Sequence, residues 1–359
     1  MRRNCYIQRA SKKSHMKRIH LLIAILIISC IGALALIKRL EASAVYNERA
    51  FFIEERIVLK GLPRDVNNLR IWIPYPVSDR WQKVSDFTLE SPFDYRVIVD
   101  KTNGTRIIYL KQDQNILDEN TAEIRISFNV KRKEYGLPFD GSTALTINPE
   151  HSRRVDLSRP EKNLSRFLKP DRLVPVNGRI KALAVEITQG KRTDLEKARA
   201  IYDYIIDKLT YSKDDPTVCG IGDSLLTLQY LKGICSDYHS LFISLARSLG
   251  IPAKFEIGFP IPADKEAGRI NGYHCWAKFY LKNKGWIPVD ISEADKHPEK
   301  RDYFFGHIDE HRIHLAGGRD INLEYAKSSQ PLNFFIYPYA ELNGKQFNDI
   351  DTEIRFKNL

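Results

Sequence analysis

The stretch that decides the fold is GICSDYHSLFISLARSLGIPA, residues 233–253. Its apolar residues recur at the spacing of one buried helical face: Leu241, Phe242, Leu245, Ala246 and Leu249. Gly250 and Pro252 are typical of the end of a helix. Counting back, the first turn begins at Cys235. A helix N-terminus presents unpaired N–H groups and positive potential, so this position favours a thiolate.

Cys235 alone leaves two interpretations open, a nucleophile and a buried structural cysteine. His274 adds a base, because an imidazole can take the thiol proton and later return it to a leaving amine. His274 opens the strand-like stretch HCWAKFYL. Alternation places His274 and Trp276 on one strand face and Cys275 on the other, so we expect Cys275 to point away from His274.

Asp290 ends the stretch GWIPVD, sixteen residues after His274. This separation suits the next strand of an antiparallel meander, where the carboxylate could accept the second ring N–H and fix the tautomer of His274. A lone Asp at a strand end also commonly caps a turn. Cys235, His274 and Asp290 together are predicted to form a catalytic triad.

Two further groups are candidates to stabilise an oxyanion. The backbone N–H of Cys235 lies at the helix start, where it could donate to the developing charge. Tyr211 is the second candidate, with a core tyrosine at a helix end as the alternative. Asp237 and His239 are expected to cap the helix or to pack on its exposed side.

Three blocks resemble the core of the transglutaminase-like superfamily, in the family's order: residues 233–253, residues 274–276 and residues 286–290. The resemblance implies an α+β fold with a papain-like transglutaminase core, in which a helix bearing the cysteine packs on an antiparallel sheet bearing the histidine and aspartate. It also implies acyl transfer through a thioester at Cys235. Many members carry an acidic residue where this chain has Lys278. The animal crosslinking enzymes have a tryptophan where Ser236 stands, and we find no calcium-binding loop pattern.

The expected domains follow from changes of period along the chain. Residues 50–147 contain alternating apolar positions and predict a β-sandwich domain, which resembles the N-terminal domain of bacterial members. Residues 178–300 are assigned to the transglutaminase-like catalytic core. Residues 301–359 resemble the C-terminal extension of bacterial members, and we expect them to pack on the core.

The N-terminus predicts a membrane anchor. Residues 1–18 carry seven basic residues and no acidic one, and residues 19–37 contain no Asp, Glu, Lys or Arg. This pattern predicts a transmembrane helix with the tail inside and the catalytic domain on the exported side of the inner membrane. A signal peptide cleaved near residues 42–44 remains the alternative and would give a secreted or periplasmic protein. A lipoprotein-like box at Cys30 is a further, weaker option.

The charge and the motifs exclude several other classes. The formal charge is +11, but outside residues 1–18 the chain holds 49 basic and 45 acidic residues, so no nucleic-acid partner is expected. Glycine patterns for phosphates or dinucleotides are absent. Possible metal ligands lack the spacing of a metal site: Cys219, Cys235, His239, His274 and Cys275. We therefore predict no cofactor and no metal.

The sequence predicts a protein or peptide substrate whose amide carbonyl is attacked by Cys235. Whether the thioester passes to water (hydrolysis, deamidation) or to an amine (transfer) stays open, as does the oligomeric state. The alternative function is a non-catalytic envelope scaffold built on the same fold. A disulfide between Cys219 and Cys275 is also left open.

Overall fold

The computed structural model describes residues 47–116, 120–136, 164–282, 284–327 and 330–359. The predicted basic tail and membrane span, with Cys5 and Cys30, lie outside these ranges. Among the helices within these ranges, none has the length and apolar character needed to cross a membrane.

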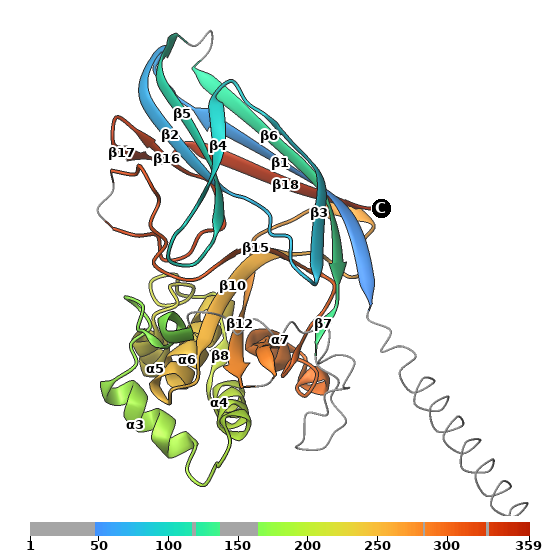
Figure 1. Ribbon diagram of the computed structural model, residues 1–359, viewed down its shortest axis with the longest axis vertical. Coiled ribbons are helices and arrows are strands. Elements are labelled where there is room, and N and C mark those ends of the chain that lie inside the picture. The colour runs from blue at the N-terminus through green and yellow to red at the C-terminus, as the bar shows by residue number, and fades with distance from the viewer. Residues whose placement is uncertain (1–46, 117–119, 137–163, 283, 328–329) are drawn as a thin grey trace, which may run out of the picture.

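Two five-stranded sheets form a β-sandwich at one end of the molecule (Figure 1). One sheet has the order β11 (Ala267–Arg269), β18 (Ile350–Asn358), β1 (Glu48–Lys60), β6 (Thr121–Lys133) and β3 (Gln82–Glu90). The other has the order β17 (Lys345–Phe347), β16 (Tyr339–Leu342), β2 (Asp65–Pro74), β5 (Arg106–Ile116) and β4 (Asp94–Val99). The strands form because apolar residues alternate along them, and these residues meet in one core between the sheets.

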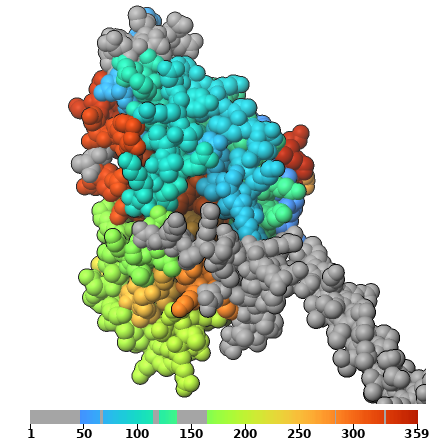
Figure 2. Space-filling view, viewed as in Figure 1, coloured from blue at the N-terminus to red at the C-terminus, as the bar shows by residue number. Residues whose placement is uncertain are grey.

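The C-terminal residues divide between the two parts of the molecule, which differs from the expected packing of residues 301–359 on the core alone. Strand β18 pairs with β1 from Phe51↔Asn358 to Leu59↔Ile350, and β16 pairs with β2. Figure 2 places much of the C-terminal part, in red, on the sandwich. A partner strand some three hundred residues away leaves no local pattern, so the sequence could not indicate this pairing.

The second part is a mixed α+β core. Its four-stranded antiparallel sheet has the order β13 (Gly285–Val289), β12 (His274–Leu281), β10 (Ala253–Pro260) and β15 (Arg312–Gly317). The helices are α3 (Gly178–Ile187), α4 (Asp194–Lys208), α5 (Ser224–Tyr230), α6 (Cys235–Ser248) and α7 (Ile291–Lys296), with short 3₁₀ turns at Leu164–Leu168 and Pro298–Lys300. Two-residue strands complete the described elements: β7 (Tyr135–Gly136) pairs with β14 (His307–Ile308), and β8 (Thr210–Tyr211) pairs in parallel with β9 (Lys232–Gly233).

Helix α6 is the central helix of the core. Every residue from Cys235 to Arg247 is buried, because α3, α4 and α5 contact it as well as the sheet. The ring centroids of Phe242 on α6 and Phe279 on β12 lie 6.0 Å apart. This packing lays the helix against the strand that carries His274.

The start of α6 is fixed by Asp237 in its first turn. The Asp237 carboxylate accepts hydrogen bonds from the backbone N–H groups of Ile234 (2.8 Å), Gly220 (2.6 Å) and Gly222 (2.7 Å). An acidic residue at this position satisfies free N–H groups and complements the helix dipole. The carboxylate therefore fixes both the first residue of α6, Cys235, and the loop before α5.

Arg319 ties the C-terminal segment to the same region. Its guanidinium is buried and donates hydrogen bonds to the Gly222 carbonyl at 2.9 Å, to the side chain of Asn333 and to the hydroxyl of Ser240 on α6. A buried cation requires such partners, since it has lost its hydration. The loop before α5, helix α6 and the C-terminal segment are thus joined through one side chain.

Candidate active site

The fold brings Cys235, His274 and Asp290 together. Cys235 is the first residue of α6, His274 is the first residue of β12, and Asp290 follows β13 directly. His274 Nε2 lies 2.6 Å from Asp290 Oδ2, and the His274 side chain also hydrogen-bonds the Cys235 sulfur. Because Nε2 is engaged by the carboxylate, Nδ1 is the nitrogen that faces the sulfur. All three residues are buried, with Cys235 2% and His274 5% exposed.

The three groups shift one another's proton affinity. A hydrogen bond from the Cys275 thiol lowers the pKa of Cys235, and the hydrogen bond and charge of His274 add to this effect against the opposing influence of burial. Burial acts to lower the pKa of His274, but the adjacent Asp290 carboxylate outweighs it and raises that pKa to about 9. Both shifts favour the same charge state, a thiolate on Cys235 beside an imidazolium on His274.

Asp290 has two structural roles. Burial acts against its ionised form, but the charge and hydrogen bond of His274 hold the pKa of Asp290 below its usual range. Its other oxygen, Oδ1, accepts from the backbone N–H of Glu293 at 3.2 Å and so caps helix α7. The hydrogen bond to the histidine and the turn capping, which the sequence left as alternatives, are both present in one side chain.

His239 lies beneath the triad, not on an exposed side of the helix as expected. Its side chain is fully buried. Nδ1 lies 2.7 Å from the Cys235 carbonyl oxygen, and the Ile291 backbone N–H donates to Nε2 at 2.9 Å. A carbonyl only accepts, so Nδ1 carries the proton and His239 is neutral. Burial accordingly lowers the pKa of His239. The residue links the start of α6 to the segment after Asp290.

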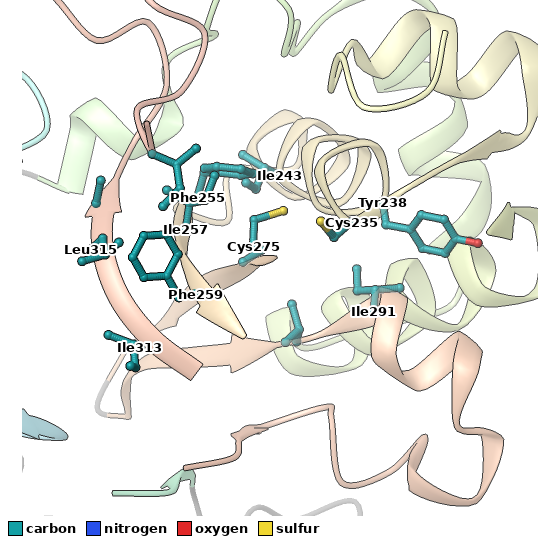
Figure 3. Packing of buried hydrophobic residues seen from close by; sticks show 14 of the residues in the cluster. Cys235, Tyr238, Ile243, Phe255, Ile257, Phe259, Cys275, Ile291, Ile313 and Leu315 are labelled. Atoms are coloured by element: carbon teal, nitrogen blue, oxygen red, sulfur yellow. The ribbon is translucent and has the colours of Figure 1, made fainter. Parts of the chain in front are cut away.

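Cys275 lies on the strand face opposite Trp276, as alternation predicts. The Trp276 indole N–H donates to Glu256 at 2.9 Å on one side of the sheet. The other side is the one that α6 covers, so Cys275 meets Cys235 across the helix-sheet contact (Figure 3). Periodicity gave the face of Cys275 relative to Trp276 correctly. It did not indicate that Cys275 and His274, expected to point away from each other, both reach the Cys235 sulfur. Cys219, Cys235 and Cys275 are all free thiols.

A groove of about 890 Å³ opens over the triad. Cys235, His274, Tyr211 and Tyr273 line it, together with basic side chains such as Lys296. Pairing of β8 with β9 places Tyr211 beside Gly233 and so next to the start of α6. The Lys296 ammonium lies 4.0 Å from the centre of the Tyr211 ring.

The first turn of α6 offers a free donor. In the described part of the chain, the N–H groups of Asp237 and Tyr238 donate to the Ile234 carbonyl, whereas that of Cys235 makes no hydrogen bond. A backbone N–H at this place points toward the region that a tetrahedral oxygen would occupy. The geometry is therefore compatible with the predicted donor.

Lys278 is the position where many transglutaminase-like proteins carry an acidic residue, and it does not line the groove. Its ammonium lies 2.8 Å from Glu256 Oε2, on the side of the sheet away from α6. The neighbouring strand β10 thus supplies a carboxylate next to this lysine, and the pair belongs to the contact between the core and the sandwich.

The comparisons with known proteins agree with this geometry. Residues 181–291 match the model of the transglutaminase-like superfamily. This chain contains a transglutaminase-like core domain. The matched range includes Cys235, His274 and Asp290, the three residues that the fold brings together.

Two relatives and one solved structure extend the comparison. An uncharacterized protein of Haemophilus influenzae is 25% identical over 92% of this chain and 96% of its own length. The uncharacterized protein YebA of Bacillus subtilis is 28% identical over 33% of this chain and 18% of its own length. A proposed cysteine protease of Cytophaga hutchinsonii is 17% identical with a TM-score of 0.56, over 88% of this chain and 93% of that chain. This last likeness shows the fold, and it extends beyond the core domain.

Proposed function

We propose that this chain is a cysteine-dependent acyl-transfer enzyme that acts on an amide of a protein or peptide through a thioester at Cys235. One observation carries the proposal. The hydrogen-bonded series Asp290, His274, Cys235 lies at the base of a groove, with its nucleophile at a helix N-terminus. A buried structural cysteine has no need of a base oriented by a carboxylate.

The reaction begins with the thiolate and the imidazolium that the pKa shifts favour. The Cys235 sulfur attacks the amide carbonyl, and the Cys235 N–H stabilises the resulting oxyanion. The Tyr211 hydroxyl, which lines the same groove, supplies a second donor. His274 gives its proton to the departing nitrogen, the carbon–nitrogen bond breaks, and a thioester remains on Cys235.

The second half of the reaction returns the site to its starting state. Neutral His274 takes a proton from the incoming water or amine, whose oxygen or nitrogen attacks the thioester carbonyl. The carbon–sulfur bond breaks, and the thiolate and imidazolium are restored. Water as the acceptor gives hydrolysis or deamidation, and an amine gives transfer. The likeness to a proposed cysteine protease supports water as the acceptor.

We also propose that the enzyme acts on the exported side of the inner membrane, held by residues 19–37. The support is the sequence pattern of seven basic residues followed by a stretch without Asp, Glu, Lys or Arg. A protein or peptide of the cell envelope is then the substrate class within reach.

The test compares envelope proteins exposed to the wild-type protein with those exposed to Cys235→Ala. Mass spectrometry distinguishes the reactions: new peptide termini indicate proteolysis, glutamine converted to glutamate indicates deamidation, and a bond between two chains indicates transfer. Any of these, lost in Cys235→Ala, supports the proposal. A thiol-directed electrophile that labels Cys235 no faster than Cys219, with no effect of His274→Ala, contradicts it.

A further inference from the structure

Cys275 stands next to the nucleophile, and the proposed reaction gives it no role. It is the second residue of β12, directly after His274, and its side chain is fully buried. In Figure 3 the sulfur atoms of Cys235 and Cys275 face each other across the contact between α6 and the sheet. The two side chains are hydrogen-bonded. Two sulfurs in such a contact share one proton between them when one is a thiolate.

The direction of this hydrogen bond follows from His239. The Ile291 N–H donates to Nε2, so the ring proton is on Nδ1. Nδ1 lies 2.7 Å from the Cys235 carbonyl and also 3.7 Å from the Cys275 sulfur, within reach of a hydrogen bond to sulfur. Because Nδ1 carries the ring proton, the Cys275 S–H cannot donate to His239 and remains free to donate to Cys235.

Burial and charge both favour the proton on Cys275 over the proton on Cys235. Among the residues that the structure describes, no cation is hydrogen-bonded to Cys275, and burial raises the pKa of its thiol well above the ordinary value. Cys235 has the His274 imidazolium beside it and a pKa well below the ordinary value. The proton therefore resides on Cys275 and the negative charge on Cys235.

We propose that Cys275 is a further catalytic residue, whose thiol, oriented by His239, donates a hydrogen bond to the Cys235 thiolate. The inference rests on Cys235 as the proposed nucleophile. A thiolate in a buried site lacks the water that would solvate it, and a fixed donor replaces part of that solvation. An ordinary core cysteine at this place would only fill volume, and its replacement by alanine or by serine would then affect the ionisation of Cys235 in the same way.

The test measures the rate at which iodoacetamide alkylates Cys235 as a function of pH, in the full chain, followed on the Cys235 peptide by mass spectrometry. The midpoint of this profile reports the pKa of the nucleophile and requires no substrate. We expect Cys275→Ala to raise the midpoint by about one pH unit, the size of one hydrogen bond from a weak donor to a charged group. Cys275→Ser keeps a donor and should leave the midpoint close to that of the wild type.

Cys219→Ala is the matched control, because Cys219 is a free, buried cysteine that lines the same groove. It should leave the midpoint unchanged. A midpoint in Cys275→Ala equal to that of the wild type overturns the inference, as does an equal shift in Cys275→Ser, which would mark a packing effect. If wild-type Cys235 has an ordinary midpoint, the proposed function fails as well. A low wild-type midpoint that Cys275→Ala leaves unmoved removes the inference alone.

Discussion

His274 Nε2 lies 2.6 Å from Asp290 Oδ2, which leaves Nδ1 as the ring nitrogen for Cys235. This hydrogen bond does more than orient the ring. Because the carboxylate is buried with the imidazolium, its charge is poorly screened and raises the pKa of His274 to about 9. The pair therefore sets both the geometry and the pH range of the site.

The first prediction concerns the pH dependence of turnover. The imidazolium must donate a proton to the departing nitrogen, so activity should fall as the pH rises through about 9, the pKa of His274. Asp290→Asn removes the charge that raises this pKa. The alkaline limb of the activity profile should then move to lower pH, toward 6.5, the ordinary pKa of a histidine. The measurement is kcat/KM against pH. Asp264→Asn, at an exposed position, is the control, and a limb that stays in place in Asp290→Asn contradicts the assignment.

The second prediction concerns His239. In His239→Leu the Cys235 carbonyl and the Ile291 N–H both lose a partner inside the protein. Each buried polar group left unpaired costs about 1–3 kcal/mol, so for the two groups we expect a loss of roughly 2–6 kcal/mol in the free energy of unfolding. Urea unfolding measures it. His297→Leu changes a half-exposed histidine and should have little effect. Equal stabilities of the two variants would show that the bonds to His239 are dispensable.

The third prediction concerns Glu55, a carboxyl in the core of the β-sandwich. Ile53 and Ile57 flank it on the same face of β1, and its Oε1 has no hydrogen-bond partner in the described structure. Burial raises the pKa of Glu55 to about 8. The folded state therefore binds this proton more tightly than the unfolded chain, whose value is near 4.5. The resulting stabilisation is complete below 4.5 and is lost as the pH rises through about 8.

Glu55→Gln removes this titration. When the pH is raised from 5 to 9, the unfolding free energy of the wild type should fall by on the order of 4 kcal/mol more than that of Glu55→Gln. Urea unfolding at the two pH values measures the difference. Glu54→Gln is the matched control, because the neighbouring carboxylate lies on the other face of β1 and is partly exposed. Parallel stability profiles of Glu55→Gln and the wild type would rule out a buried neutral carboxyl.

The fourth prediction concerns the pair of Lys278 and Glu256, whose side chains are both buried. Lys278→Met leaves the Glu256 carboxylate short of its closest cation, and removing one partner of a buried pair costs about 3 kcal/mol or more. Adding Glu256→Gln removes the uncompensated charge and should restore much of the loss, since Gln still accepts from the Trp276 indole.

Chemical unfolding of the single and double variants measures this coupling. Lys282→Met, at an exposed position just after β12, is the control and should be nearly neutral. A double variant less stable than Lys278→Met would mean that the Glu256 charge is held by its other partners, such as Lys254 at 3.2 Å.

Much of the site was predictable because its signals are local. Helical spacing with Gly250 and Pro252 placed the start of α6 at Cys235, where the structure has it. Strand alternation identified the faces of β12, and the antiparallel pairing of β12 with β13 brings Asp290 near His274. These features depend on periods of a few residues, which can be recognised directly in the sequence.

The buried partners of the triad were not predictable in the same way. His239 was expected to cap the helix or to lie on its exposed side, because a helix with one apolar stripe usually has an exposed face. Here α3, α4, α5 and the sheet all contact α6, so that no face of it remains free. A sequence-level signal did exist: Ser240, Ile243 and Ser244, outside the stripe, are small or apolar, which suits a helix covered on every side.

By itself, the sequence determined a helix that begins with a cysteine, a strand that begins with a histidine, and an aspartate at the end of the next strand. It also determined their order, which is that of the transglutaminase-like core. Only the tertiary structure decided that β18 completes the sandwich and that Cys275 and His239 lie against Cys235. The physical reason is that local period sets which face a side chain occupies, whereas long-range packing sets what that face meets.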